Sequence, residues 1–187
     1  MVVRCAEPLR ETSFRLTGDM SYGSKLLGRA SPDQKSPKVR ALLVAFIGAT
    51  LAGVSLGFLS ESSQQALIMG SFGASIFLVM AVPDLPFAQP RNVLAGHFLA
   101  SAIGLACFHF IGESFFIMGL ALGLTTVAML FFKVAHPPAG SNPIAIFLAG
   151  PDWSFLVTPT LAGALIIVAL GIAYNNLWAD RSYPKYW

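Results

Sequence analysis

Long apolar runs alternate with short polar breaks from residue 39 onward, whereas residues 1–38 are polar and mixed in charge. A membrane-spanning helix needs about 20 predominantly apolar residues. One apolar piece, 144–149, is too short to cross a bilayer and is expected to be a re-entrant half-helix. The sequence therefore predicts an all-α membrane protein with this half-helix and five transmembrane helices, at 39–59, 66–82, 93–112, 115–134 and 155–174.

Two proline-rich breaks, 83–92 and 133–143, interrupt the apolar pattern. In the second break, Pro137 and Pro138 lack backbone N–H groups, which predicts a non-helical loop, and Gly140 is expected to bend the chain sharply. Lipid does not satisfy the polar backbone of such a loop. The break is therefore expected to be buried in protein or to line a wet cavity, and it is the first place to look for function.

Each break leads into the next apolar stretch through an asparagine. Asn142 followed by Pro143 has the pattern of an N-cap and a first helical residue, and Asn92, shortly after Pro90, is placed to cap the third span. The start of a helix offers unpaired N–H groups and the positive end of a dipole, which attract anions. Both helix starts are therefore candidate anion sites.

The breaks also belong to a weak internal repeat. Residues 67–70 (Leu-Ile-Met-Gly) and 116–119 (Phe-Ile-Met-Gly) each open a span that ends in a break. Two crossings separate the matched spans, so the repeats would be parallel, about an axis along the membrane normal. Both breaks would then lie close together on one side of the membrane. A chance match within a restricted set of residue types is the alternative.

Composition and charge favour a membrane protein of simple organisation. Hydrophobic residues make up 55% of the 187 residues and charged residues only 11%, against about 25% charged in soluble domains. We expect a cytoplasmic polar arm, 1–38, followed by one transmembrane domain, 39–187. The net charge of +3 reflects basic residues gathered on one side of a membrane, so a nucleic-acid partner is not expected.

Basic residues also predict the orientation. Eight of them precede or begin the first span, and Arg91 and Lys133 lie at the two breaks, whereas the loops at 60–65 and 113–114 contain none. With five spans, the positive-inside rule places the N-terminus and both breaks in the cytoplasm and the C-terminal tail outside. Arg181 and Lys185 in the tail count against this placement. The expected location is the plasma (inner) membrane.

The candidate binding site combines charge, hydrogen-bond donors and helix starts. Its expected members are Arg91, Asn92, His97, His136, Ser141 and Asn142, with Pro90, Pro137, Pro138, Gly140 and Pro143 shaping the loops. Arg91 offers a permanent charge and a guanidinium fork suited to a planar oxyanion. The alternative role of Arg91 is to set orientation and contact lipid, and that of His136 is to hold the loop by a hydrogen bond.

An enzyme or a metal site lacks supporting residues. His97 and His109 lie nearly on one helix face, but no carboxylate or cysteine joins them at ligand spacing. The sequence shows no nucleophile motif and no phosphate-binding glycine loop. We therefore expect neither enzymatic activity nor a cofactor. A membrane-embedded site built on His97, His109 and His136 is kept as an alternative.

Several short blocks resemble the HPP family of small integral membrane proteins, over residues 39–187. They are His136-Pro137-Pro138-Ala139-Gly140 with Asn142-Pro143, Phe72-Gly73-Ala74-Ser75, Gln89-Pro90-Arg91-Asn92, Gly96-His97 and Tyr183-Pro184-Lys185-Tyr186-Trp187. Because plastid and cyanobacterial members are associated with nitrite transport, the resemblance implies a transporter or channel for a small inorganic anion, nitrite first. Ser141 stands where the family pattern often has alanine. A homo-oligomer is expected, and a regulatory or assembly subunit without transport activity is the remaining alternative.

Overall fold

The computed structural model describes Leu26, residues 36–63 and residues 69–187. Most of the expected arm, 1–38, therefore lies outside the described residues. The chain divides into two compact units, Met1–Ser36 and Pro37–Trp187. In its described part the second unit contains helices and no strand, as expected: α2 (Val39–Ser63), α3 (Gly70–Ala81), η1 (Pro86–Ala88), α4 (Pro90–Phe110), α5 (Phe115–Phe131), η2 (Pro137–Ser141), α6 (Asn142–Ala149), η3 (Trp153–Leu156), η4 (Val157–Leu161) and α7 (Ala162–Asn175).

Three helical stretches are long and apolar enough to cross a membrane by length and composition: Val39–Ser62, Pro90–Phe110 and Trp153–Asn175. Helices α3 and α5 are apolar but shorter, with 12 and 17 residues. Part of the expected second span, 66–68, lies outside the described residues. The apolar pattern thus located the helices, while their ends differ from the expected ones.

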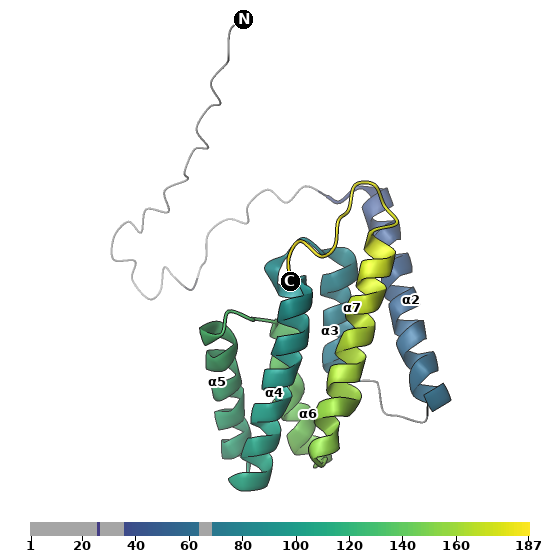
Figure 1. Ribbon diagram of the computed structural model, residues 1–187. Helices are drawn as coiled ribbons and strands as arrows, with labels where there is room; N and C mark the ends of the chain where they lie inside the picture. Colours follow the sequence, from purple (N-terminus) through teal and green to yellow (C-terminus); the bar gives the residue numbers. More distant parts are fainter. Residues whose placement is uncertain (1–25, 27–35, 64–68) are drawn as a thin grey trace, which may run out of the picture. The chain divides into compact units, whose positions relative to one another are not determined.

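The helices run between two ends of the bundle, which we call the Arg40 end, where α2 begins, and the Trp153 end, where η3 begins. Figure 1 shows α2 and α4 running toward the Trp153 end and α3, α5 and α7 running back. Helix α6 again runs toward the Trp153 end, where Phe147 packs against Phe108 near the end of α4, with ring centroids 5.3 Å apart. Helices α5 and α6 therefore form a hairpin that leaves the Trp153 end and returns to it.

The C-terminal tail lies at the Arg40 end, which corrects the expected topology. Arg40 forms two hydrogen bonds to the Asp180 carboxylate, and Lys185 Nζ lies 3.0 Å from Asp84 in the first break. The tail is therefore on the same side as the start of α2 and the first break, not on the opposite side. The expected placement failed because it took α5 as a full crossing, whereas α6 brings the chain back before α7 begins.

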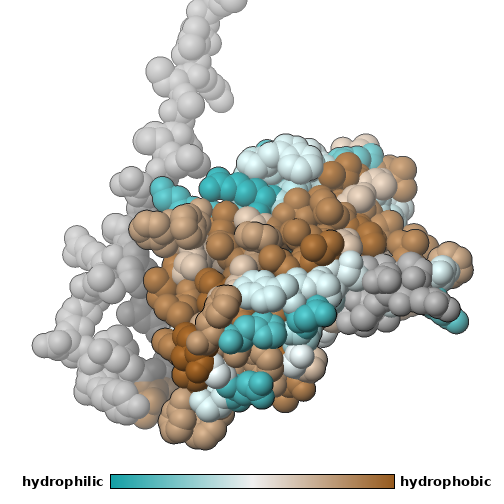
Figure 2. Space-filling model, turned by 60° about the horizontal axis from the view of Figure 1, so that its bottom comes forward, coloured by the Kyte–Doolittle hydropathy of each residue, from teal (hydrophilic) through white to brown (hydrophobic). Residues whose placement is uncertain are grey.

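A core cluster joins α2, α3 and α7. Its buried side chains include Leu56, Phe72, Val79 and Ile167. The outer surface is also apolar: the face seen in Figure 2 is largely hydrophobic, with hydrophilic residues in separate patches. Large exposed apolar side chains occur on α2, α4 and α5. A surface of this kind suits a hydrocarbon environment, where apolar groups need no covering by protein.

Both helix starts differ from the expected ones. Helix α4 begins at Pro90 with Gln89 as its N-cap residue, so Asn92 lies inside the first turn and caps nothing. Asn142 has helical φ and ψ of −59° and −40°, and its N–H donates to the Ala139 carbonyl. A proline is compatible with the first turn of a helix. The second break therefore forms a 3₁₀-helix, η2, that leads directly into α6.

This arrangement corrects one further expectation about the second break. Gly140 lies within η2 and is not among the described residues with positive φ, so it makes no sharp left-handed bend. The residue with φ of 56° is Lys133, which follows the C-cap residue of α5, Phe132. The first N–H of α6 is already bonded to η2, and an anion site at this helix start stays a prediction.

The last membrane-spanning stretch begins irregularly. It passes from a 3₁₀-helix, Trp153–Leu156, through a π-helical turn, Val157–Leu161, into α7. Within the turn, Thr158 has non-helical φ and ψ of −132° and 119°. Pro159 lacks the N–H that a regular helix would use. The irregular turn presents Thr160 to the interior, where its side chain is fully buried.

Candidate functional site

The two proline-rich breaks lie against each other, as the sequence predicts. His136 Nδ1 lies 2.7 Å from the Phe87 carbonyl oxygen of the first break. Asn92 Nδ2 donates to the Ala135 carbonyl at 2.9 Å. The breaks are thus joined by hydrogen bonds at His136 itself and at its neighbour Ala135. This contact fixes the imidazole relative to the start of α4.

Two glycines on α4 allow the second break to approach this closely. A Cβ atom at Gly96 would lie 2.7 Å from His136 Cβ and 3.3 Å from the Val134 carbonyl oxygen. At Gly104 it would lie 2.8 Å from Ile146 Cδ1 and 3.1 Å from Pro143 Cα. Small residues at such positions let helices pack at short range. Without them, the break could not reach the interior face of α4.

Ser75, His97 and His136 form the centre of the site. Ser75 Oγ lies 3.0 Å from His97 Nε2 and 2.8 Å from His136 Nε2. The two imidazole centroids are 5.0 Å apart. All three side chains have 0% exposure. Two histidines from distant parts of the sequence therefore share a single hydroxyl group inside the protein.

Hydrogen bonds continue from His97 toward the Trp153 end. Asn142 Nδ2 lies 3.1 Å from His97 Nδ1 and donates to Ser101 Oγ at 2.9 Å. Ser101 Oγ lies 2.9 Å from Thr160 Oγ1. Pro159, next to Thr160, lines a surface pocket of about 420 Å³ together with residues of the Trp153 end: Ala149, Pro151, Ser154 and Phe155.

We call this connected set the polar chain: the Phe87 carbonyl and the side chains of His136, Ser75, His97, Asn142, Ser101 and Thr160. All six side chains are completely buried, and the buried polar residues of the described chain include no aspartate, glutamate, lysine or arginine. Ionisable residues inside a membrane domain are costly, and they commonly mark ion or proton paths. The polar chain is therefore the strongest functional candidate in the described structure.

One arrangement of hydrogens satisfies every ring nitrogen while both histidines are neutral. The Phe87 carbonyl only accepts, so His136 carries its hydrogen on Nδ1 and accepts at Nε2. The Asn142 amide nitrogen only donates, so His97 accepts at Nδ1 and carries its hydrogen on Nε2. His97 then donates to Ser75, and Ser75 donates to His136. The donors point in one direction, from Asn142 to Phe87.

Two buried asparagine oxygens beside the polar chain have no hydrogen-bond partner within the described residues. They are Asn142 Oδ1 and Asn92 Oδ1, on residues with 0% and 5% exposure. Both amides donate through Nδ2, which leaves the oxygen as the free atom. Buried polar atoms without partners are rare in folded proteins. The interior thus offers free acceptors when the histidines are neutral.

The structure brings some predicted site residues together and leaves others apart. His97, His136 and Asn142 belong to the polar chain. Asn92 lies outside it and donates a hydrogen bond to the second break, next to His136. Arg91 is exposed, with its Nη2 3.4 Å from the Phe132 carbonyl. Ser141 is also exposed and donates to the Pro138 carbonyl within its own turn. These last two residues lie outside the polar chain, so a ligand role for them remains a prediction.

The three histidines do not converge. His109 Nε2 lies 3.0 Å from the Pro151 carbonyl oxygen, and the His109 ring stacks on Trp153 at the Trp153 end. Across Leu26, 36–63 and 69–187, no group of three or more metal-ligating His, Cys, Asp or Glu side chains is found. The geometry of these residues gives no support to the histidine metal site that the sequence left open.

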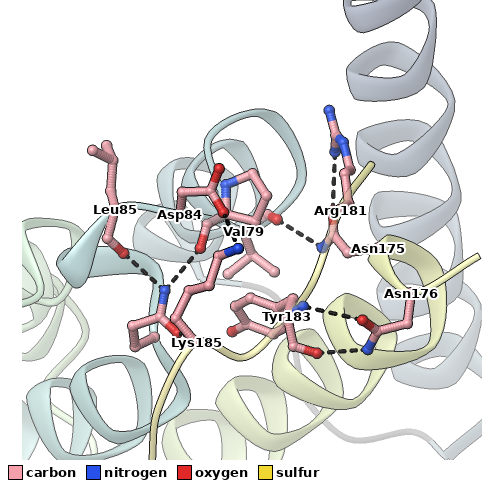
Figure 3. Close-up of polar contacts among 10 residues, drawn as sticks. Val79, Asp84, Leu85, Asn175, Asn176, Arg181, Tyr183 and Lys185 are labelled. Atoms are coloured by element: carbon pink, nitrogen blue, oxygen red, sulfur yellow. Dashed lines mark hydrogen bonds and ion pairs between the residues drawn. The ribbon is translucent and has the colours of Figure 1, made fainter. Parts of the chain in front are cut away.

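The C-terminal tail closes over the first break (Figure 3). Tyr183 Oη donates to the Ala88 carbonyl at 2.7 Å, and the Lys185 N–H donates to Gln89 Oε1 at 2.8 Å. Gln89, fully buried, also donates to the Pro83 and Leu85 carbonyls. Burial raises the pKa of the Tyr183 phenol above its ordinary value. The tail therefore holds in place the same break that binds His136.

The tail itself is fixed by α7 and α2. Asn176 exchanges two hydrogen bonds with the Tyr183 backbone, and Arg181 donates to Asn175 Oδ1 at 2.9 Å (Figure 3). The hydrogen bonds from Arg40 are the main cause that lowers the pKa of the Asp180 carboxyl. These contacts hold the tail against the start of α2 and the end of α7.

Sequence reasoning missed the serines and the threonine of the polar chain. Ser75 follows Ser71 by one helical turn, and Ser101 follows His97 by the same spacing, so both pairs lie on one helix face. Thr160 belongs to a Thr-Pro-Thr interruption of an otherwise apolar span. Polar residues at helical spacing inside apolar spans were the available signal.

Comparison with known proteins covers almost the whole described domain. Residues 34–184 match the family described as HPP, transmembrane region. A transmembrane protein of Dictyostelium discoideum is 35% identical over 133 residues, 67% of this chain and 47% of the relative. A second one is 29% identical over 153 residues, 78% of this chain and 49% of the relative. The chain thus spans about half the length of these curated relatives, and no solved structure matches it significantly.

Proposed function

Because the chain belongs to the HPP transmembrane family, we propose that it moves a small inorganic anion across a membrane, with nitrite as the first candidate. The observation that carries the proposal is the polar chain. It extends from the first break at the Arg40 end to Thr160, beside the pocket at the Trp153 end. Polar groups buried inside a membrane domain are costly and commonly mark ion paths, which favours transport over a purely structural role.

The topology that we propose has an even number of crossings, with both ends of residues 39–187 on one side. The α5–α6 hairpin enters from the Trp153 end and returns there, and it brings His136 and Asn142 to the interior. Helices α3 and α4 form a similar pair, since each pair consists of a helix, a 3₁₀ turn and a helix with proline in its first turn. This likeness supports a parallel internal repeat.

The proposed function gives Arg91 a role at the outer end of the polar chain. It is an exposed cation in the first turn of α4, beside the loop that carries His136. A guanidinium at a helix start attracts a planar anion and orients it. We propose that Arg91 receives the anion and that the polar chain lies on its path through the protein.

The test is a flux assay with the purified full chain in proteoliposomes. Nitrite, nitrate, formate and chloride are each offered outside, and their appearance inside is measured against protein-free vesicles. The proposal expects uptake of at least one of these anions, with nitrite fastest. A chain that inserts correctly and moves none of the four would overturn the proposal and favour a regulatory or assembly subunit.

A further inference from the structure

We propose that His97, Ser75 and His136 form a one-proton switch that turns the Asn142 amide over, so that binding of a proton is coupled to binding of the anion. The inference rests on the proposed function for the identity of the anion. The switch itself rests on the geometry of the polar chain.

The first step is the reversal of the chain by one added proton. The proton binds at His97 Nδ1, the atom that now accepts from Asn142. The Nε2 hydrogen of His97 passes to Ser75 Oγ, and the Ser75 hydrogen passes to His136 Nε2 over 2.8 Å. His136 then holds hydrogens on both nitrogens and the positive charge, while His97 is neutral again. No bond other than those to hydrogen changes.

The second step concerns Asn142. Once His97 carries a hydrogen on Nδ1, the amide nitrogen of Asn142 can no longer donate to it. A half-turn of the amide places Oδ1 toward His97 Nδ1–H and Ser101, which gives the unpartnered oxygen two donors. The amide nitrogen then takes the position that Oδ1 occupied. The free atom beside the chain changes from an acceptor to a donor.

This exchange is what couples the proton to the anion. Without the added proton the cluster is neutral and presents an amide oxygen, which repels an anion. With the proton it carries a positive charge and presents N–H groups, which bind one. If proton binding favours anion binding, the anion favours proton binding by the same factor. The outcome is movement of the anion together with a proton.

Among the described residues, the buried polar side chains around the switch include no aspartate, glutamate, lysine or arginine. Helix α3 contributes only Ser71 and Ser75, α6 contributes Asn142, and η4 contributes Thr160. Arg91, Lys133 and Asp84 on the neighbouring elements are exposed, and Asp84 pairs with Lys185. Arg181 is half-buried and donates to the Met80 carbonyl at the end of α3. Ser75 Oγ also lies 3.0 Å from the Ser71 carbonyl, which offers its hydroxyl a resting position between transfers.

Histidine tautomers test the switch without any transport assay. The full chain with ¹⁵N-labelled histidine is placed in lipid nanodiscs, and His109→Gln removes the signal of the third imidazole. We expect one neutral ring with hydrogen on Nε2 (His97) and one with hydrogen on Nδ1 (His136). On acidification both rings should change with a single shared midpoint, because one proton reverses both. Identical tautomers, or two independent midpoints, would overturn the switch.

Coupling is then measured in proteoliposomes with a pH dye inside and nitrite outside. The wild type should acidify the interior as nitrite enters. Ser75→Ala should abolish this proton entry and Ser75→Thr should restore it, while Thr126→Ala, an exposed hydroxyl bonded within α5, should behave as wild type. Nitrite entry without protons in the wild type rejects the switch and leaves the proposed function intact. Absence of all anion flux rejects the proposed function, and the tautomer measurement still decides the switch.

Discussion

Arg40 and Asp180 are separated by 140 positions in the sequence, yet two hydrogen bonds of 2.8 and 3.1 Å join their side chains. The start of α2 and the tail after α7 therefore lie at the same end of the helix bundle. We predict that the double variant Arg40→Cys, Asp180→Cys forms a disulfide on mild oxidation. A membrane-impermeant thiol reagent should label both single variants from the same side. Labelling from opposite sides would contradict the even-crossing topology.

Gly96→Ala should displace the second break from α4. The new Cβ would lie 2.7 Å from His136 Cβ, and overpacking of this kind costs about 1–3 kcal/mol. Thermal unfolding in detergent should therefore show a lower midpoint, and the tautomer signal of His136 should shift. The matched control is Gly119→Ala on α5, where a Cβ meets no atom within 4 Å. That variant should be neutral or stabilised by about 0.5–1 kcal/mol. Equal effects of the two variants would refute the close approach at Gly96.

Lys133→Gly should stabilise the protein. Lys133 has φ of 56° and follows the C-cap residue of α5, and the N–H of the next residue, Val134, bonds back to the Met129 carbonyl. Glycine is favoured at this position after a helix, and a left-handed conformation costs other residues about 1–2 kcal/mol. We expect a higher unfolding temperature with unchanged insertion. A lower temperature would mean that the lysine side chain makes a stabilising contact that outweighs the strain.

Arg91→Lys should slow anion uptake although the charge is kept, because the planar guanidinium fork is lost. Arg91→Ala should slow it further. Initial rates of nitrite entry are compared at equal protein density in the vesicles. Lys133→Gln, which removes an exposed cation at the other break, is the control and should keep the wild-type rate. Wild-type rates in both Arg91 variants would show that this arginine only sets orientation.

Tyr183 makes the tail sensitive to alkali. Its burial raises the pKa of the phenol, so the folded protein keeps the neutral form at pH values where an unfolded chain ionises, above about 10. The corresponding stability is present below that pH and is lost as pH rises through the folded value. The difference between the alkaline absorbance titrations of wild type and Tyr183→Phe isolates this phenol. Its midpoint should lie above 10, and a midpoint at or below 10 would contradict the buried position.

The apolar pattern located the helices because hydrophobic length is a local property that reads directly from the sequence. The contact between the breaks could also be predicted from the sequence, since prolines and polar residues within apolar spans must be covered by protein. His97 and His136 were selected for the same reason. Their shared partner Ser75 was not selected. Contact among three side chains from α3, α4 and the second break depends on how each element is rotated and how deeply it lies in the bundle, which the sequence of one segment does not determine.

The errors have equally specific causes. Asn92 and Asn142 have the sequence pattern of caps, but Asn92 is the third residue of α4 and Asn142 has helical φ and ψ with its N–H bonded to η2, so neither side chain acts as a cap. The side of the tail was wrong because a count of basic residues assumes that every apolar helix crosses. The short α6 reverses the direction of the chain, and its length alone did not reveal this.

The closure of Tyr183 and Lys185 over residues 83–89 also fixes an order of assembly. The first break is synthesised before α4, α5, α6 and α7, but the hydrogen bonds that hold Ala88 and Gln89 come from a segment that follows α7. During synthesis, the Phe87 carbonyl therefore lacks its final anchorage until nearly one hundred further residues have emerged, since Lys185 lies 96 positions beyond Gln89. The break that binds His136 is therefore completed only by a segment that is synthesised after all the helices of the domain.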